Sequence, residues 1–158
     1  MWLLTHRSEL RSRLIADRHY NRQKVGSRGF VPPGRCIVLL AKSEDALWVT
    51  SWPFAQYVRH AWVGAWVNTL FRNESIDEAS FLIREAISVT RSFWVAPPLG
   101  LVSFVDPKHV RPTKIRGKTI YGYCYLKAGF THVGFTKGGL WVWQILPHEM
   151  PEAMSDGL

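Results

Sequence analysis

Hydrophobic residues in the middle of the chain predict a strand, a helix and a second strand in succession. Residues 61–70 form a long apolar run rich in Val and Trp, which is typical of a strand buried on both faces. Residues 79–94 then carry apolar side chains at helical spacing, and residues 101–105 form a second apolar run. Because the three segments follow one another within about 45 residues, we expect a right-handed βαβ unit with two parallel strands.

Polar residues mark the ends of this unit. The first strand has only two polar residues, Asn68 and Thr69, and residues 71–76 are predicted to turn the chain. Asp77 and Glu78 are expected in the first turn of the helix, where carboxylates interact favourably with the helix dipole. In open α/β sheets, ligands bind beyond the carboxyl ends of parallel strands, and this edge is therefore the expected place of a site.

The N-terminal part is predicted to add one helix and three strands. Residues 2–5 are a candidate edge strand, and Ser8 is the expected N-cap of a helix over residues 9–20. Residues 36–41 and 46–51 are predicted to form a hairpin. The predicted apolar side of the helix comprises Leu10, Leu14 and Ile15.

The C-terminal part is predicted to contain a short helix and a last hairpin. The helix is expected to begin at Gly117 or Thr119 and to end at Lys127, and hairpin strands are expected at residues 131–136 and 140–146. The fold class is therefore α/β: a single domain over residues 1–150, with a mixed, partly parallel sheet flanked by helices, followed by a tail over residues 151–158.

Composition narrows the classes of function. No apolar run reaches the ~18 residues of a membrane-spanning helix, so no membrane partner is expected. Two cysteines are too few for a disulfide framework or a zinc cage, and the 6 histidines show no spacing typical of a metal site. We expect an intracellular protein with reduced thiols, and the oligomeric state, a dimer included, stays open.

Basic residues gather in two predicted loops, residues 22–35 and 108–118. The chain has a net charge of +8 and a pI near 9.9, which favours a polyanionic partner, and clustered Lys and Arg suit the phosphates of double-stranded DNA. Phe30 would stack on a base or enter a duplex as a wedge. The alternative is two solvated loops. The residues predicted to contact nucleic acid are Arg22, Lys24, Arg28, Phe30, Lys108, Arg111, Lys114 and Arg116.

The order of elements, with Tyr-Leu-Lys-Ala-Gly-Phe at residues 125–130, resembles the GNAT acyltransferase superfamily. That family often ends its last helix with an aromatic residue, a few further residues and Gly-Phe before a final hairpin. The resemblance implies a GNAT-like domain that uses acetyl-CoA or another acyl-CoA. It also implies that Tyr125 lies near the leaving thiolate, where its hydroxyl can protonate sulfur.

A narrower resemblance is to phage Mom-type DNA-modification proteins, which belong to the same superfamily. It is carried by His19-Tyr20 before a basic loop that passes through residues 32–34, and by residues 70–74 before the main helix. Mom-type proteins modify the exocyclic amine of adenine in DNA and so shield phage DNA from restriction. The resemblance implies a DNA-modification enzyme in the cytoplasm of a bacterial host.

Four residues are candidates for catalysis. His19 would act as a base, Tyr20 as a proton donor or a stacking ring, and Asp106 as a base or acceptor for the amine. Tyr125 is the fourth. An adenine amine is already neutral but a poor nucleophile, so its positioning matters more than its deprotonation. The structural alternatives are a packed helix end for the first two, a turn for Asp106 and a core aromatic for Tyr125.

The segment before the main helix departs from the GNAT pattern. GNAT proteins usually hold the CoA pyrophosphate with a Gly-rich loop, whereas residues 71–76 contain no glycine and carboxylates such as Glu74 oppose a phosphate. The free N–H groups at a helix start can still bind phosphate. The residues expected to bind the cofactor are Arg72, Asn73, Ser75 and Ser80.

The residues leave three functions open. The first is a Mom-like enzyme that adds an acyl-derived group to adenine in DNA, and this requires extrusion of the base, with Tyr20 or Trp52 to stack on it. The second is a GNAT N-acyltransferase that acts on a protein or small amine, which the clustered basic charge opposes. The third is a non-catalytic DNA-binding protein on a GNAT-like fold, which the acidic segment before the main helix favours.

Overall fold

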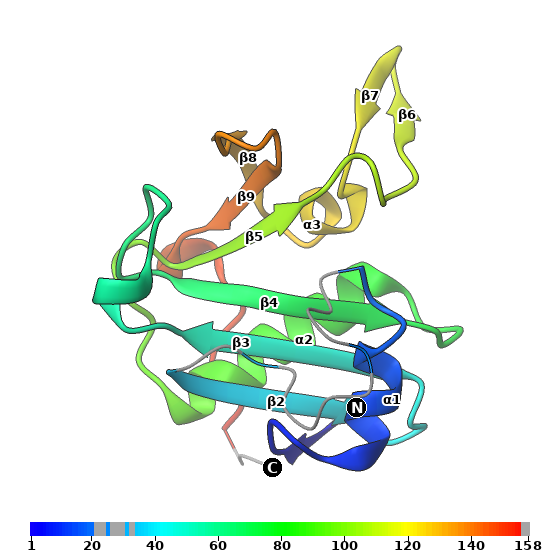
Figure 1. The fold of residues 1–158 in the computed structure, drawn as a ribbon, viewed down its shortest axis with the longest axis vertical. Helices are drawn as coiled ribbons and strands as arrows, with labels where there is room; N and C mark the ends of the chain where they lie inside the picture. The colour runs from blue at the N-terminus through cyan, green and yellow to red at the C-terminus, as the bar shows by residue number, and fades with distance from the viewer. Residues whose placement is uncertain (21–24, 26–30, 32–33, 156–158) are drawn as a thin grey trace.

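A mixed sheet forms the centre of the molecule (Figure 1). The computed structural model describes residues 1–20, 25, 31 and 34–155, and within them the sheet has 7 strands in the order β1-β2-β3-β4-β5-β9-β8. Its strands are β1 (Trp2–Thr5), β2 (Arg35–Ala41), β3 (Ala46–Trp52), β4 (Trp66–Asn73), β5 (Leu101–Val105), β8 (Thr131–Phe135) and β9 (Trp141–Ile145). This arrangement confirms the α/β class and the mixed, partly parallel sheet.

The predicted βαβ unit is present. β4 and β5 pair in parallel, and the helix α2 (Ala79–Phe93) connects them, whereas the other neighbouring strands of this sheet pair antiparallel. The parallel ladder comprises Trp66–Leu101, Val67–Val102 and Asn68–Ser103 and then stops, although both strands continue. β4 and β5 therefore separate toward their carboxyl ends, as Figure 1 shows.

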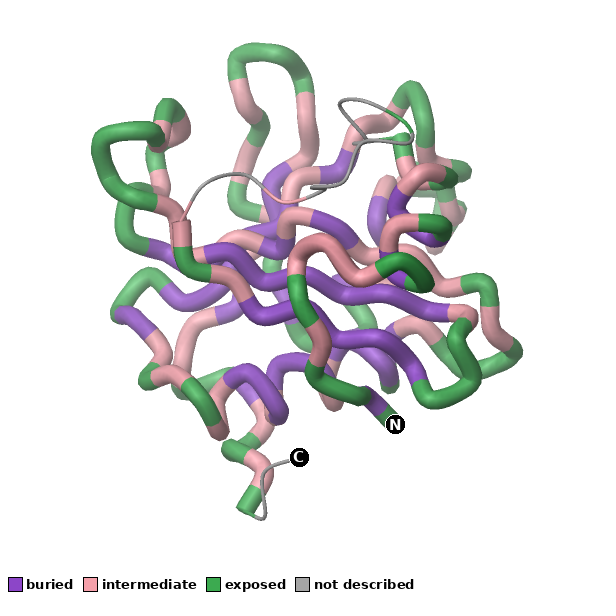
Figure 2. The backbone as a smooth tube through the Cα atoms, turned by 60° about the horizontal axis from the view of Figure 1, so that its bottom comes forward, coloured by how far each residue is buried: buried purple, intermediate pink, exposed green. Residues whose placement is uncertain are grey.

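The central strands are buried on both faces because helices cover the sheet from opposite sides. Alternate residues of β2, Ile37 and Leu39, join a core cluster with α2, whereas Val38 and Leu40 join a second cluster with the helix α1 (Leu10–Ala16). This division follows the period-two alternation of a strand. Figure 2 shows buried positions concentrated along these strands.

α1 is shorter than predicted and has a different cap. Glu9, not Ser8, is the N-cap, and its carboxylate accepts a hydrogen bond from the Ser12 backbone N–H at 2.8 Å. The helix ends at Ala16, so His19 and Tyr20 follow it rather than close it. Its predicted apolar side was wrong in part: Ile15 is buried, but Leu10 and Leu14 are 56% and 53% exposed. One short helix covers only the few β2–β4 residues beneath it.

The central strand is displaced along the sequence from its predicted range. Residues 61–65 precede it, and β4 instead continues through residues predicted to turn, because its ladder with β3 extends to the Ala46–Asn73 pair. Asp77 and Glu78 also lie outside the helix, where Glu78 is the N-cap of α2. Backbone pairing with β3 therefore overrode the apolar pattern of the sequence.

The second basic segment contains an unpredicted hairpin. β6 (Thr113–Ile115) and β7 (Lys118–Ile120) pair antiparallel around Arg116 and Gly117, which both have positive φ, at 50° and 79°. Two positive φ values fit a two-residue hairpin turn. The predicted helix start at residue 117 or 119 was therefore wrong, and α3 spans Tyr123–Lys127. The β8–β9 hairpin confirms the last predicted pair of strands.

The C-terminal residues pack against α2. Short 3-10 helices lie at Ala55–Tyr57 and Pro147–Glu149. After the second of these, Arg91 donates to the Pro151 carbonyl at 2.8 Å and Ser88 to the Glu152 carbonyl at 2.6 Å. The Met154 backbone N–H also donates to the Ser88 carbonyl at 3.1 Å, so residues 151–154 of the predicted tail are held on the helix. None of the helices in the described residues is long and apolar enough to cross a membrane.

Ile15 and Leu14 provide a test of which side of α1 is buried. We expect Ile15→Ala to lower the free energy of unfolding by about 2–5 kcal/mol, because it removes buried methyl groups and leaves a cavity. Leu14→Ala removes an exposed side chain and should change it by about 0.5 kcal/mol or less. Urea unfolding measures both, and equal losses would contradict the observed orientation of the helix.

Candidate functional site

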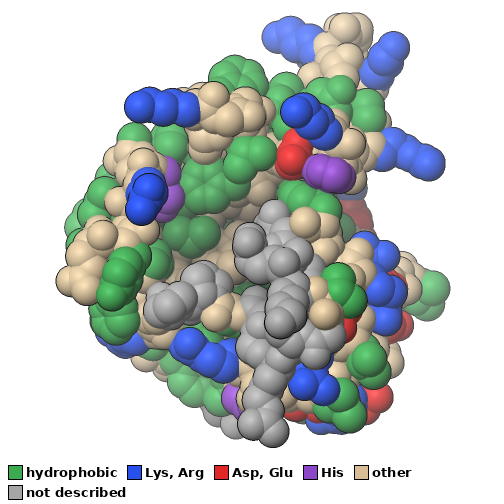
Figure 3. All heavy atoms as spheres, viewed as in Figure 1, with side chains coloured by type: hydrophobic (Ala, Val, Ile, Leu, Met, Phe, Trp, Pro, Cys, Tyr) green, Lys and Arg blue, Asp and Glu red, His purple; other side chains and the backbone are tan. Residues whose placement is uncertain are grey.

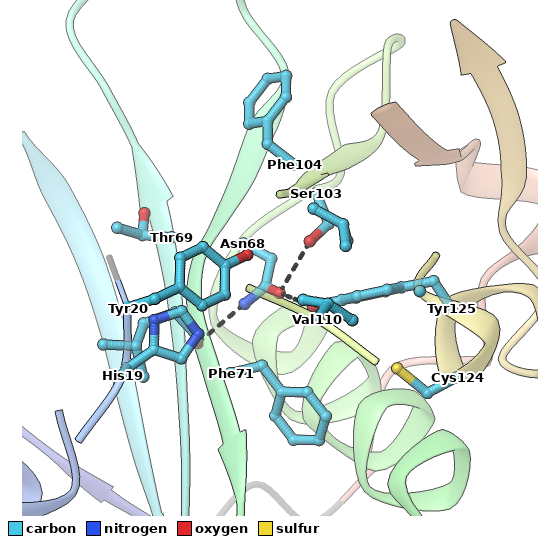
Figure 4. A pocket seen from close by; sticks show the side chains of 13 residues that line it. His19, Tyr20, Asn68, Thr69, Phe71, Ser103, Phe104, Val110, Cys124 and Tyr125 are labelled. Carbon is cyan, nitrogen blue, oxygen red and sulfur yellow. Dashed lines mark hydrogen bonds between the residues drawn. The ribbon is translucent and has the colours of Figure 1, made fainter. Parts of the chain in front are cut away.

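A cavity of about 170 Å³ lies where β4 and β5 separate (Figure 4). Its walls come from segments far apart in the sequence: the residues after α1, both diverging strands, the segment after β5 and the first turn of α3. Three of the four predicted catalytic residues, His19, Tyr20 and Tyr125, line this cavity. The fold therefore brings His19-Tyr20 next to Tyr125, the first residue of the motif at residues 125–130.

A β-bulge shapes the β4 side of the cavity. Val49 pairs with Leu70 and Thr50 with Asn68, so Thr69 is an extra residue on β4 relative to β3. Bulges bend a strand and re-aim its side chains, and they are frequent next to functional sites. Here the bulge lies at the point where the parallel ladder ends.

Asn68 is held by hydrogen bonds to the strands on both sides and to α3. Its Nδ2 donates to the carbonyls of Val49 and Leu70, each at 3.0 Å. Its Oδ1 accepts from the Ser103 hydroxyl at 3.2 Å and from the Tyr125 hydroxyl at 2.7 Å. Because both ends of the buried amide are occupied, its orientation is fixed, and it positions Tyr125 in turn.

Tyr125 is a buried phenol at the cavity wall. Burial raises its pKa well above the ordinary value, so the hydroxyl stays protonated at neutral pH. The helix that carries it begins after Gly122, whose φ is 93° and where an added Cβ would lie 2.7 Å from Trp143 Nε1. Glycine is required at this position because both the conformation and the close approach exclude a side chain.

Three rings stack beside the cavity, and two of them, His19 and Tyr20, line it. Tyr20 lies between His19, at 4.5 Å between ring centroids, and His109, at 5.2 Å. The Tyr20 hydroxyl also accepts a hydrogen bond from the Asp106 backbone N–H at 3.3 Å. An oxygen that accepts one hydrogen bond can still donate its own hydrogen. The stack thus joins the segment after α1 to the segment after β5.

The two rings of the stack that line the cavity, His19 and Tyr20, are neutral at physiological pH. Burial, together with the charge of Arg72, lowers the pKa of His19 to about 4, while a hydrogen bond to the Phe71 backbone opposes the shift. Burial raises the pKa of Tyr20. Neutral His19 is a proton acceptor at pH 7, but a weaker base than the sequence indicated.

Asp106 lies beside the cavity rather than in its wall. Its carboxylate accepts from the Lys108 backbone N–H at 2.9 Å and lies 3.8 Å from His109 Nε2. These contacts are those of a turn, the structural alternative for Asp106. Its backbone, rather than its carboxylate, contacts Tyr20.

Three of the four predicted cofactor-binding residues organise the β4–α2 connection. Arg72 donates to Glu74 at 2.6 Å, and Glu74 also accepts two hydrogen bonds from Arg18, each at 2.7 Å. Asn73 Oδ1 accepts from the Ser75 backbone N–H at 2.9 Å, and Asn73 Nδ2 donates to the Asp77 carbonyl at 2.8 Å. The sequence predicts that the Glu74 carboxylate repels a phosphate, but two arginines, Arg18 and Arg72, neutralise it.

A second cavity, of about 330 Å³, continues from the first. The two share Val110, Gly122 and Cys124, and the second reaches the start of α2, where Ser80, the fourth predicted residue, lies. Lys127 and Arg111 supply positive charge there, although Lys127 is paired with Glu78. Burial raises the pKa of the Cys124 thiol to about 11, which removes it as a nucleophile at neutral pH.

The predicted nucleic-acid residues divide between the described and undescribed parts of the chain. Lys108, Arg111, Lys114 and Arg116 are exposed. Figure 3 shows Lys and Arg side chains projecting from the region of the β6–β7 hairpin. Arg22, Lys24, Arg28 and Phe30 lie outside the described residues.

Trp52 is placed away from the cavity. The Arg35 guanidinium lies 4.8 Å from the centroid of its ring and 5.0 Å from that of Trp94, and Trp66 packs against its edge. Trp52 therefore belongs to an aromatic cluster at the other end of the sheet, and it does not line the described cavity. Of the two stacking candidates, Tyr20 lines the cavity, but both faces of its ring are covered by His19 and His109.

Comparison with models of protein families, with curated proteins and with solved structures finds no match to this chain. Within the described residues, no group of three or more His, Cys, Asp or Glu side chains is arranged to hold a metal ion. The interpretation of the site therefore rests on its own geometry.

The sequence did not identify Asn68, Ser103 and His109 as site residues. The first two are polar residues inside apolar strands, and a buried polar group in a central strand usually has a specific partner. The sequence therefore marks Asn68 and Ser103 as unusual, but it does not show which residues they contact. His109 reaches the stack only through the turn after β5, which has no sequence pattern of its own.

Glu74 predicts a pH dependence of stability. Its hydrogen bonds to Arg18 and Arg72 lower its pKa from 4.5 to about 2, so it stabilises the fold fully above pH 4.5 and loses this effect as the pH falls toward 2. We expect Glu74→Gln to lower the free energy of unfolding at pH 7 by about 1–2 kcal/mol, because its partners are partly exposed.

Denaturant unfolding at pH 7 and at pH 3 measures this effect, and the difference between Glu74→Gln and the unsubstituted protein should shrink at the lower pH. Glu152→Gln, which replaces an exposed carboxylate, is the matched control and should have little effect at either pH. A difference that persists unchanged at low pH would contradict the proposed role of the charged carboxylate.

Proposed function

We propose that this protein is a Mom-like DNA-modification enzyme that transfers an acyl-derived group from an acyl-CoA to the exocyclic amine of adenine. The observation that carries the proposal is the separation of β4 and β5 around the fixed Asn68–Tyr125 pair, with the His19–Tyr20 stack facing the same cavity. One cavity thus presents a proton donor, Tyr125, and a proton acceptor, His19.

The surroundings of the motif at residues 125–130 support the proposal. Tyr125 lines the cavity, Gly129 has a positive φ of 103° directly after α3, and buried Phe130 leads into β8. The strand order, with one parallel pair at its centre, agrees with the expected GNAT-like domain. We take these features as support for a GNAT-like enzyme.

The two connected cavities suit an extended thioester. Where parallel strands separate, their facing backbone groups no longer bond one another, and the amides of a pantetheine arm can pair with them as an added strand does. Lys127, Arg111 and the N–H groups at the start of α2 lie at the other end, where phosphates would bind. Binding there requires Lys127 to leave Glu78 or the carboxylate to turn away.

The reaction forms a C–N bond and breaks a C–S bond. The neutral amine would attack the thioester carbonyl, and its proton would pass to neutral His19, a proton acceptor in the cavity wall. The sulfur would leave as a thiolate and take a proton from Tyr125, whose hydroxyl must first rotate away from Asn68, and the proton held by His19 would then restore the Tyr125 hydroxyl. Tyr20 supplies a hydrogen-bond donor to the adenine through its hydroxyl, because both faces of its ring are covered by His19 and His109.

The test is mass spectrometry of nucleosides from the DNA of cells that express the protein. We expect a modified adenosine, and we expect Tyr125→Phe to lower its rate of formation by about 10²–10⁴-fold, because it removes the proton donor while keeping the ring. Tyr121→Phe removes a hydroxyl outside the cavity and is the matched control. Unmodified DNA, or equal losses in both variants, would contradict the proposal.

A second candidate is a DNA-binding protein that has lost the cofactor. The ion pair between Lys127 and Glu78 at the start of α2 favours it, because it occupies the charge that phosphates need. Thermal unfolding with acetyl-CoA distinguishes the two, since a ligand that binds the native state raises the Tm in proportion to the logarithm of its concentration. No shift with acetyl-CoA, together with a shift on adding duplex DNA, would select this candidate.

Both candidates predict salt-dependent binding of duplex DNA. If about five phosphates are neutralised, log K should fall against log salt with a slope of about −4 to −5. Lys114→Ala with Arg116→Ala, on the β6–β7 hairpin, should make the slope shallower by about 1–2. Lys42→Ala, in the β2–β3 turn, is the control, and a flat salt response would exclude the proposed DNA partner.

A further inference from the structure

A large groove opens beside the cavity on the same side of the sheet. It measures about 770 Å³ and lies between the connection that precedes β4, the strand β5 and the β8–β9 hairpin. Figure 3 shows it as a hollow with hydrophobic side chains on its floor. Phe104 lines both the groove and the cavity, so the two adjoin along β5. Its size is that of a ligand site.

Aromatic rings form the floor and one wall of the groove. His60, Trp62 and Phe104 lie within reach of one another, with ring centroids 5.1 Å apart for His60–Phe104 and 6.3 Å for Trp62–Phe104. Phe135 lines the groove from the β8–β9 hairpin, where it packs against His132 and Trp141, and is 59% exposed. One exposed and three half-buried aromatic rings gathered in one hollow, with no covering element among the described residues, indicate a ligand.

The polar groups of the groove are positively charged or neutral. Arg59 and Lys137 stand exposed on opposite walls, and the described lining contains no carboxylate. His60 Nδ1 accepts from the Trp62 backbone N–H at 3.0 Å, so neutral His60 carries its hydrogen on Nε2. The groove thus combines ring faces with cations.

We propose that this groove binds unpaired nucleobases of a DNA strand, namely those that flank the base entering the cavity between β4 and β5. Aromatic platforms bordered by Lys and Arg are how proteins hold single strands, because every base has a face to stack and every linkage has a phosphate. Bases inside a duplex have no free faces, so the groove selects unpaired nucleotides. The identification of DNA rests on the proposed function, but the stacking does not require group transfer.

Direct binding without acyl-CoA tests the proposal. A labelled thymidine oligonucleotide of about 12 nucleotides is compared by fluorescence anisotropy with an abasic strand that has the same number of phosphates. We expect the base-containing strand to bind at least about tenfold more tightly, since stacking on one ring accounts for that ratio.

Two pairs of variants locate the binding. Phe135→Ala should weaken binding of the thymidine strand by about tenfold and leave the abasic strand unaffected. Tyr57→Ala removes an exposed ring of the 3-10 helix outside the groove and should change neither. Lys137→Ala should weaken both strands, whereas Lys42→Ala, which removes the same charge elsewhere, should not.

Three outcomes would overturn the proposal: equal binding of the two strands, an unaltered thymidine complex in Phe135→Ala, or equally tight binding of an acidic peptide of matched charge. The last would assign the groove to a protein partner. The binding assay contains no acyl-CoA and so does not depend on group transfer. If the strand binds as expected but cellular DNA is unmodified, only the proposed transfer reaction is refuted. Modified DNA without strand binding would refute only the role of the groove.

Discussion

The buried amide of Asn68 is the interaction on which the site depends. Its four hydrogen bonds connect β3, β4, β5 and α3 at the point where the parallel ladder ends. An unpaired amide at this depth would be costly, so the native arrangement requires all of these partners at once. The bond to Ser103 joins β4 to β5 at the last pair of the parallel ladder. The bond to Tyr125 fixes that side chain in the wall of the cavity that opens beyond this pair.

Ion pairs around the β4–α2 connection explain how a glycine-free segment fits this fold. Glu74 joins Arg18 after α1 to Arg72 on β4, and Glu78 joins Lys127 on α3 to the start of α2. Carboxylates that oppose a phosphate when considered alone are therefore paired with cations from distant elements. These pairs connect the segment after α1 to β4 and α3 to the start of α2, and a phosphate bound near the start of α2 would compete with Glu78 for Lys127.

The successes and errors of the sequence-based prediction have distinct physical causes. The βαβ unit and the last hairpin were predicted because long apolar periods and a Gly-Gly turn are local signals. Residues 61–65 were wrongly placed in a strand because an apolar run does not say where backbone pairing starts. The β6–β7 hairpin was missed because Arg116 adopts a positive φ that is uncommon for arginine.

The sequence by itself determined the fold class, the parallel pair and three residues of the cavity, His19, Tyr20 and Tyr125, because these follow from local periodicity and short motifs. Only the tertiary structure decided what surrounds them. Asn68 gains its role from partners on three other elements, and the aromatic groove unites residues 59–62, Phe104 and the β8–β9 hairpin. Such contacts join residues far apart in the chain, and a linear pattern carries no record of which surfaces the closing sheet brings together.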